Sequence, residues 1–234
     1  MKLVDSPTRI LRSLPCFAAL AAEPMAALHQ AAYYVSYAKG ETIILEGEPC
    51  PGLFIVRSGT VKLYRSSATG QEQIIRIVSR RDCFECTPLL DHGSNPASAE
   101  ALEDCQALLL PASIFKSLTK ANSEVLAGLL PVIAARVRSL LNMVEDFSFR
   151  QVYPRLAKLL FQLSERQDDR LVVSPSLPLN QQHLACILGC SRQILNTSLR
   201  RLAKERTIAT EGRRIVILDV ERIRRVAGVG NQVK

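Results

Sequence analysis

Two cysteines in the segment RDCFEC, Cys83 and Cys86, have the types and spacing that could do chemistry. A CxxC pair can bind a metal ion or exchange a disulfide, and Arg80 and Arg81 beside it would lower a thiol pKa. Zinc and iron–sulfur sites usually have four ligands, however, and this pair supplies two. The alternative is that both side chains are buried thiols that pack as small apolar groups. The pair alone does not distinguish a metal or redox site from two buried thiols.

The residues that could serve in catalysis or in a metal site are scattered along the chain. The three histidines, His29, His92 and His183, fall in separate regions, and no HxH pair, P-loop, nucleophile elbow or paired carboxylates accompany them. This pattern weighs against an enzyme, including a cupin-type metal enzyme. A cytosolic thiol redox protein that uses the CxxC pair is a second alternative. It would leave the basic C-terminal part of the chain without a role.

The cysteine count and the hydropathy pattern bear on the compartment. Seven cysteines are an odd number, the N-terminus has no apolar run of a secretory type, and nowhere do eighteen apolar residues run together. We expect a cytoplasmic protein with reduced thiols and no membrane partner. Cys105, Cys186 and Cys190 lie in apolar segments and are expected in the core.

The net charge of +8 is unevenly distributed. Residues 148–234 hold sixteen Lys and Arg against seven Asp and Glu, a balance of +9, whereas residues 1–147 hold fourteen against fifteen. The excess basic charge of the last third is typical of a module that meets a polyanion such as DNA.

The first half of the chain has strand-like periodicity. Short runs rich in β-branched and aromatic residues recur from about Tyr34 to Leu110, separated by turn residues every eight to twelve positions. This spacing is typical of an antiparallel barrel or sandwich. Residues 7–30, which precede these runs, are expected to form short helices.

A long helix is predicted next, over residues 122–147. Apolar residues there alternate at spacings of four and three, which is the seam of a parallel two-stranded coiled coil. The alternative is a helix that packs on its own domain, which needs only a broader apolar stripe. Pro131 removes one helical hydrogen bond, so the helix is expected to bend or begin near it. The seam consists of Leu126, Leu130, Ile133, Val137, Leu140, Val144 and Phe147.

The segment LNQQHLACILGCSRQILNTSLRRLAKERTIATEGRRIVIL predicts a winged helix-turn-helix. Asn180 can cap a helix over 181–188, Gly189 can end it, and Ser191 can cap a second helix running to about residue 204. A hairpin around residues 210–218 would form the wing. We expect Ile194, Leu195, Leu199 and Leu202 to be buried. Arg192, Gln193, Asn196 and Arg200 share the opposite face and have the chemistry to read guanine or adenine edges.

This order of parts resembles the CRP/FNR superfamily of bacterial transcription regulators over nearly the whole chain. The run KGETIILEGEPCPGLFIVRSGTVKLY is similar to the family's β-roll, and LGCSRQILNTSLRRL to its recognition helix. The resemblance implies an α+β chain in three parts. These are an antiparallel, jelly-roll-like β-roll sensor domain over residues 1–121, a dimerisation helix over 122–147 and a winged helix-turn-helix DNA-binding domain over 148–234.

The resemblance also implies partners and sites. The expected partners are a second copy of the chain, a palindromic operator in double-stranded DNA with half-sites about 34 Å apart, and RNA polymerase. Dimer contacts would come from Ile133, Val137, Leu140, Val144 and Phe147. The expected DNA-binding residues are Gln181, which would approach a phosphate, and Ser191, Arg192, Gln193, Asn196, Thr197, Arg200 and Arg201.

The effector is expected to differ from cyclic AMP. Family members that bind this nucleotide hold its ribose with a Gly-Glu pair and its phosphate with a following Arg-Ser pair. The corresponding effector-pocket positions here are Phe84-Glu85, beside Cys86, and Pro96-Ala97. A phosphate without its arginine loses a charge-assisted hydrogen bond of roughly 1.5–3 kcal/mol. Cyclic AMP is therefore not the expected ligand.

The resemblance leaves the cofactor unknown. Oxygen sensors of the family group their cluster cysteines near the N-terminus, where this chain has only Cys16. The family's haem-containing carbon monoxide sensor has a cysteine and a histidine close to residues 85–87, and His92 is the nearby histidine here, but the spacing differs and a CxxCH motif is absent. A haem, metal or redox sensor at Cys83 and Cys86 stays an alternative to a sensor of a small organic molecule.

Overall fold

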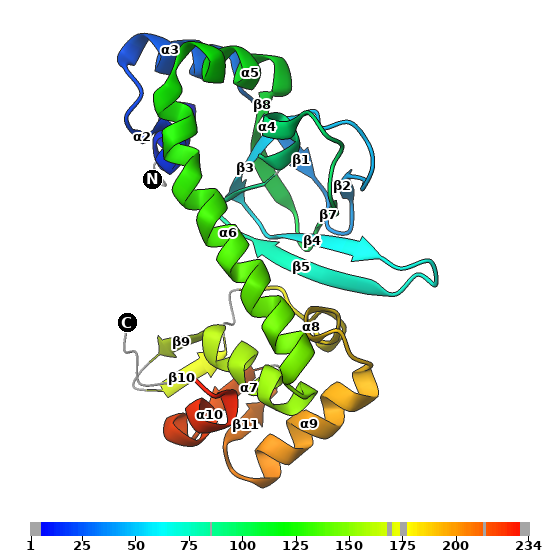
Figure 1. Ribbon diagram of the computed structural model, residues 1–234. Helices are drawn as coiled ribbons and strands as arrows, with labels where there is room; N and C mark the ends of the chain where they lie inside the picture. The colour runs from blue at the N-terminus through cyan, green and yellow to red at the C-terminus, as the bar shows by residue number, and fades with distance from the viewer. Residues whose placement is uncertain (1–5, 85, 168–169, 174–176, 213, 230–234) are drawn as a thin grey trace. The chain divides into compact units, whose positions relative to one another are not determined.

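A computed structural model describes residues 6–84, 86–167, 170–173, 177–212 and 214–229 (Figure 1). The chain divides into two compact units, residues 1–139 and 140–234. The boundary lies within the long helix α6 (Ser123–Phe149), whereas the sequence predicted this helix as a separate part between two domains. Each unit is described by itself.

The N-terminal unit begins with three helices, as expected for residues 7–30. They are α1 (Pro7–Arg12), α2 (Pro15–Ala18) and α3 (Ala22–Ala31). Proline stands at the first position of both α1 and α2, where its missing N–H costs no helical hydrogen bond.

Eight strands follow and form two antiparallel four-stranded sheets, β1-β8-β3-β6 and β2-β7-β4-β5. Strands β2, β3, β4, β5 and β8 overlap the predicted runs ETIIL, GLFIV, TVKLY, QIIRIV and QALLL, whereas β1, β6 and β7 had no predicted run. The strands are β1 (Tyr33–Tyr37), β2 (Thr42–Ile44), β3 (Gly52–Ser58), β4 (Val61–Ser66), β5 (Glu72–Val78), β6 (Cys83–Phe84), β7 (Ser98–Ala101) and β8 (Cys105–Pro111).

Two apolar clusters hold this unit together. One lies between the sheets, where Phe54 and Phe84 stack with ring centroids 4.8 Å apart. The other joins one side of the β-roll to α1, α2, α3, α5 (Ala112–Ala121) and the first turns of α6. Aromatic and aliphatic side chains dominate both clusters, and their burial is the main stabilising contribution to the unit. The short helix α4 (Thr87–Asp91) follows β6 directly.

Helix α6 is continuous and contains Pro131. It begins at Ser123, close to the predicted residue 122, which excludes the second of the two alternatives, a start near Pro131. Gly128 lets the helix approach the N-terminal segment closely, because a Cβ there would stand 2.6 Å from the Cα atom of Cys16. Only Val125 and Leu129 of this helix are fully buried among the residues described.

In the described part of the C-terminal unit, the end of α6 is followed by four further helices and one four-stranded antiparallel sheet of order β11-β12-β10-β9. The predicted helix pair and the wing are confirmed, whereas α7, β9, β10 and α10 were not anticipated. The elements are α7 (Val152–Gln162), β9 (Ser164–Gln167), β10 (Arg170–Val173), α8 (Gln181–Leu188), α9 (Arg192–Lys204), β11 (Ile208–Glu211), β12 (Arg214–Ile217) and α10 (Val220–Ala227).

The predicted α+β class, with an N-terminal antiparallel β-roll, a long helix and a C-terminal winged helix-turn-helix, is confirmed. None of the helices in the described residues combines the length and apolarity that a membrane span requires.

Candidate nucleic-acid interface and sensor site

The helix-turn-helix is set by three local capping interactions. The Asn180 side chain accepts a hydrogen bond from the His183 backbone N–H at 2.8 Å, and the His183 ring completes a capping box. Gly189 ends α8 in the left-handed conformation at φ 57°. The Ser191 hydroxyl then accepts from the Ile194 N–H at 3.3 Å and starts α9. These interactions fix the turn between α8 and α9 at the predicted residues.

The predicted DNA-binding residues lie mostly on exposed surface of α8 and α9. Gln181 occupies the first position of α8, where free backbone N–H groups favour an anion. Arg192 and Gln193 occupy the first turn of α9 and are exposed. Asn196 is partly buried. The remaining exposed members are Ser191, Thr197, Arg200 and Arg201.

The buried face of α9 differs from the prediction at one residue. Leu195 and Leu202 are fully buried, and Leu199 is partly buried, as expected. Ile194, expected in the core, is 49% exposed, and Ser198 is buried instead. The helix turns 100° per residue, so a face centred on Leu195, Ser198 and Leu202 places Ile194 outside it.

The C-terminal end of α9 is tied to its own unit by Glu205. This carboxylate accepts hydrogen bonds from the Tyr153 hydroxyl at 2.7 Å and from Arg201 Nε at 3.0 Å, and it pairs with Arg222 Nη2 at 3.1 Å. The Tyr153 hydrogen bond is the main cause of a lowered Glu205 pKa. Burial is the main cause of the raised pKa of Tyr153, about 12. These contacts join the C-terminal end of α9 to α7 and α10.

Arg201 therefore differs from the other predicted DNA-binding residues. Its guanidinium lies 4.1 Å from the centroid of the Tyr153 ring as well as bonding to Glu205. Thr197 also has an internal contact, since its hydroxyl donates to the Gln193 carbonyl at 3.0 Å. Arg192, at the opposite end of α9, has no such contact among the described residues.

A row of exposed apolar side chains runs along one side of α6. Val137 and Leu140 are about half exposed, Val144 is 61% exposed and Phe147 is 40% exposed. Ile133, the first of the predicted dimer contacts, is partly buried against its own N-terminal cluster. An exposed apolar row of this kind on one helix is typical of a surface that packs against another molecule.

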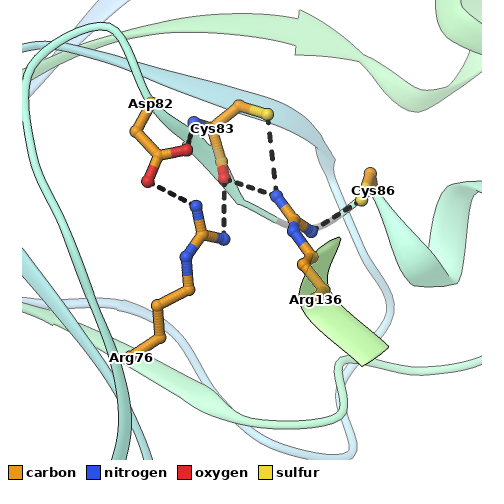
Figure 2. A network of polar contacts seen from close by, with 5 residues as sticks. All are labelled: Arg76, Asp82, Cys83, Cys86 and Arg136. Carbon is orange, nitrogen blue, oxygen red and sulfur yellow. Dashed lines mark hydrogen bonds and ion pairs between the residues drawn. The ribbon is translucent and has the colours of Figure 1, made fainter. Parts of the chain in front are cut away.

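Cys83 and Cys86 lie on either side of the Arg136 guanidinium (Figure 2). Arg136 Nη1 donates to Cys86 Sγ at 2.7 Å, and Nη2 donates to the Cys83 carbonyl at 2.8 Å. Arg76 Nη1 donates to the same carbonyl at 3.0 Å, and Arg76 also pairs with Asp82. Two cations thus converge on one carbonyl oxygen.

The interpretation of the pair as buried thiols is supported by the structure. Cys83 is 4% exposed and Cys86 is fully buried. Burial raises the Cys83 pKa to about 11, which the Arg136 charge only partly offsets. The expectation that Arg80 and Arg81 lower this pKa is wrong. Both arginines are exposed, Arg81 in a left-handed turn at φ 68°, and the cations that act on the thiol are Arg136 and Arg76.

Of the other predicted effector residues, the structure describes Pro96 and Ala97. Glu85 lies outside the described residues. Pro96 is exposed, and Ala97 is buried at 6% exposure. Within the described ranges, no group of three or more His, Cys, Asp or Glu side chains is arranged to hold a metal ion. Arg76 and Arg136 were not predicted as site residues, because neither belongs to a local motif.

Comparisons with known proteins match both parts of the chain. Residues 34–122 match the family described as cyclic nucleotide-binding domain, and residues 154–226 match the Crp-like helix-turn-helix domain. A CRP-like cAMP-activated global transcriptional regulator from Mycobacterium tuberculosis is 30% identical over 220 residues, which cover 93% of this chain and 98% of the relative. The cyclic AMP receptor protein of Thermus thermophilus is 30% identical over 72% of this chain and 76% of its own length.

Solved structures share the fold. FixK2 from Bradyrhizobium japonicum superposes with a TM-score of 0.72 at 21% identity, covering 87% of this chain and 99% of that one. A transcriptional regulator of the CRP/FNR family from Thermus thermophilus, TTHA1359, gives a TM-score of 0.68 at 21% identity, covering 84% and 98%. The sequence match to the mycobacterial regulator spans both the β-roll and the helix-turn-helix. The chain belongs to the CRP/FNR family of DNA-binding transcription regulators.

Proposed function

We propose that the protein is a cytoplasmic, homodimeric transcription regulator that reads a palindromic operator with α9 and controls RNA polymerase there. It performs no catalysis in this account. The observation that carries the proposal is the outer face of α9, where Arg192 and Gln193 stand exposed in the first turn. In helix-turn-helix proteins this turn of the second helix meets base edges in the major groove.

The proposed dimer rests on the apolar row of α6. Val137, Leu140 and Val144 follow the four-three spacing of a coiled-coil seam, and all three are exposed in the single chain. A second copy of α6 would bury this row symmetrically. Two recognition helices related by a two-fold axis would then meet half-sites about one DNA turn apart.

We propose further that the β-roll responds to a molecule other than cyclic AMP. The mycobacterial relative is named as cAMP-activated, but this chain has Pro96 and Ala97 where the family's nucleotide-binding members place Arg and Ser. Proline has neither a backbone N–H nor a polar side chain, and the alanine side chain provides no donor. The phosphate would remain without its usual charge-assisted partner.

A redox, haem or metal sensor at Cys83 and Cys86 is the weaker candidate. The reactive and ligating form of cysteine is the thiolate, and burial raises the Cys83 pKa to about 11. A cationic guanidinium also lies 2.7 Å from Cys86 Sγ, where it would repel a metal cation and separate the two sulfur atoms (Figure 2). Both features oppose metal binding and disulfide formation.

Replacing Arg192 by alanine is expected to weaken binding to the selected operator by about 1–3 kcal/mol and to relax specificity at one base pair, because Arg pairs with guanine in a bidentate way. Fluorescence anisotropy with operator and random duplexes measures both effects. Arg225→Ala is the matched control, since Arg225 is exposed on α10 and its loss changes the net charge equally. Equal weakening of operator and random DNA by Arg192→Ala would contradict base reading.

Cyclic AMP is expected to bind with a Kd weaker than about 1 mM and to leave operator affinity unchanged. Titration calorimetry of the full-length protein measures the first quantity, with the mycobacterial regulator as the positive control. The double variant Pro96→Arg, Ala97→Ser restores the pair of nucleotide-binding members and is expected to tighten binding. Saturable binding of cyclic AMP to the wild-type protein at micromolar concentration would contradict this part of the proposal.

A further inference from the structure

The N-terminal unit contains a cavity of about 540 Å³ that the DNA-binding function does not use. Its walls are the segment between α1 and α2, the β5–β6 turn and the middle of α6. The volume lies in the range of pockets that hold small organic ligands. None of Cys86, Pro96 and Ala97 belongs to its lining, so it differs from the effector site expected from the sequence.

The lining is apolar with a cationic side. Leu14, Leu129 and Val132 contribute apolar surface. Three arginines also line the cavity, against a single aspartate, and they are Arg76, Arg81 and Arg136. The aspartate, Asp82, pairs with Arg76. The lining therefore carries an excess of positive charge.

Arg136 carries a charge that its neighbours leave uncompensated. Its hydrogen-bond acceptors are the Cys83 carbonyl and the sulfur atoms of Cys86 and Cys83, and within the described residues no carboxylate lies at ion-pair distance. Burial raises the pKa of Cys83 to about 11 and that of Cys16 to about 12, so these two thiols are neutral at pH 7. A partly buried cation that lacks an anionic partner favours the binding of an anion.

We propose that this cavity binds a small organic anion, with an apolar body against Leu14, Leu129 and Val132 and an acidic group that pairs with Arg136. A guanidinium presents a planar fork of N–H donors that suits carboxylate and similar oxyanions. Because Arg136 belongs to α6, the bound ligand joins this helix to the β5–β6 turn and the N-terminal segment. The site requires neither DNA nor a second copy of the chain.

The test uses the full-length protein without DNA and two fluorescent probes. The first, 8-anilinonaphthalene-1-sulfonate, has an apolar body and one anionic group, and the second, N-phenyl-1-naphthylamine, has nearly the same body without the charge. We expect Arg136→Gln to weaken binding of the anionic probe at least about tenfold. The same change should alter binding of the neutral probe less than about twofold. Arg136→Lys, which keeps the charge, should fall between the wild type and Arg136→Gln.

Two further variants separate the site from general effects. Arg138→Gln removes the same charge from an exposed position of α6 outside the cavity lining, and it should leave both probes unaffected. Ala135→Phe fills the cavity without changing charge and should weaken both probes. Circular dichroism shows whether each variant is folded. If Arg136→Gln does not fold, the Ala135→Phe result tests the proposal by itself. Equal affinity of the anionic probe for the wild type and a folded Arg136→Gln or Ala135→Phe would overturn the proposal, while the tests of α9 would stand.

Discussion

Replacing Leu140 by glutamate is expected to convert the protein from a dimer into a monomer and to weaken operator binding at least about 100-fold, because linked half-site binding is lost. Leu140 is 49% exposed in the single chain and lies in the middle of the proposed seam between Val137 and Val144. In the dimer, each copy would bury an unpaired carboxylate against apolar partners, which costs several kcal/mol. Size-exclusion chromatography with light scattering measures the mass, and anisotropy measures the affinity.

Asn142→Glu is the matched control for this prediction. Asn142 is exposed on the same helix, two residues from Leu140 and away from the apolar row, so it receives the same carboxylate without burying it. This variant should remain dimeric and bind the operator normally. A Leu140→Glu protein that stays dimeric, or a wild-type protein that is monomeric at micromolar concentration, would contradict the proposed interface.

Leu195→Ala is expected to destabilise the C-terminal unit by about 2–5 kcal/mol, whereas Ile194→Ala should cost less than about 0.5 kcal/mol. Leu195 is fully buried among side chains of α7, α8 and α10, so its truncation leaves a cavity. Ile194 is 49% exposed, so truncating its side chain leaves little empty space in the core. Hydrogen exchange of the full-length protein, followed over residues 152–167 and 177–212, measures the free energy of opening.

The two neighbours form a strict comparison, since both are branched aliphatic residues in the same turn of α9. Equal losses of stability in the two variants would mean that α9 buries a different face and that Arg192 and Gln193 are not both exposed. The measurement is made without DNA because an exposed Ile194 on this surface can also contact the duplex.

Local signals explain why the helix-turn-helix could be predicted. Asn180, Gly189 and Ser191 each act on the backbone of residues within four positions, and the structure confirms all three. The burial of α9 was harder to predict. Ser198, a small polar residue, occupies the buried face, and a reading that follows only apolar residues placed Ile194 there instead.

The environment of the cysteine pair depends on contacts that no local pattern contains. Arg136 reaches Cys86 across fifty residues of sequence, and Cys16 adds to the same cavity from the N-terminal segment. The nearest arginines in sequence, Arg80 and Arg81, were expected to act on the thiols but lie exposed. Sequence proximity was therefore a poor guide here, because the cations that act on the Cys83 thiol, Arg136 and Arg76, come from other elements of the fold.

The central claim, that α9 of a symmetric dimer reads a defined operator, is tested most directly by selecting bound sequences from random double-stranded DNA with the full-length protein. We predict one palindromic motif whose half-site centres lie about 10–10.5 base pairs, or 34 Å, apart. The Arg192→Ala protein should select the same half-site spacing with one symmetric base-pair position relaxed. Recovery of no motif, or of a motif without two-fold symmetry that Arg192→Ala leaves unchanged, would contradict the account.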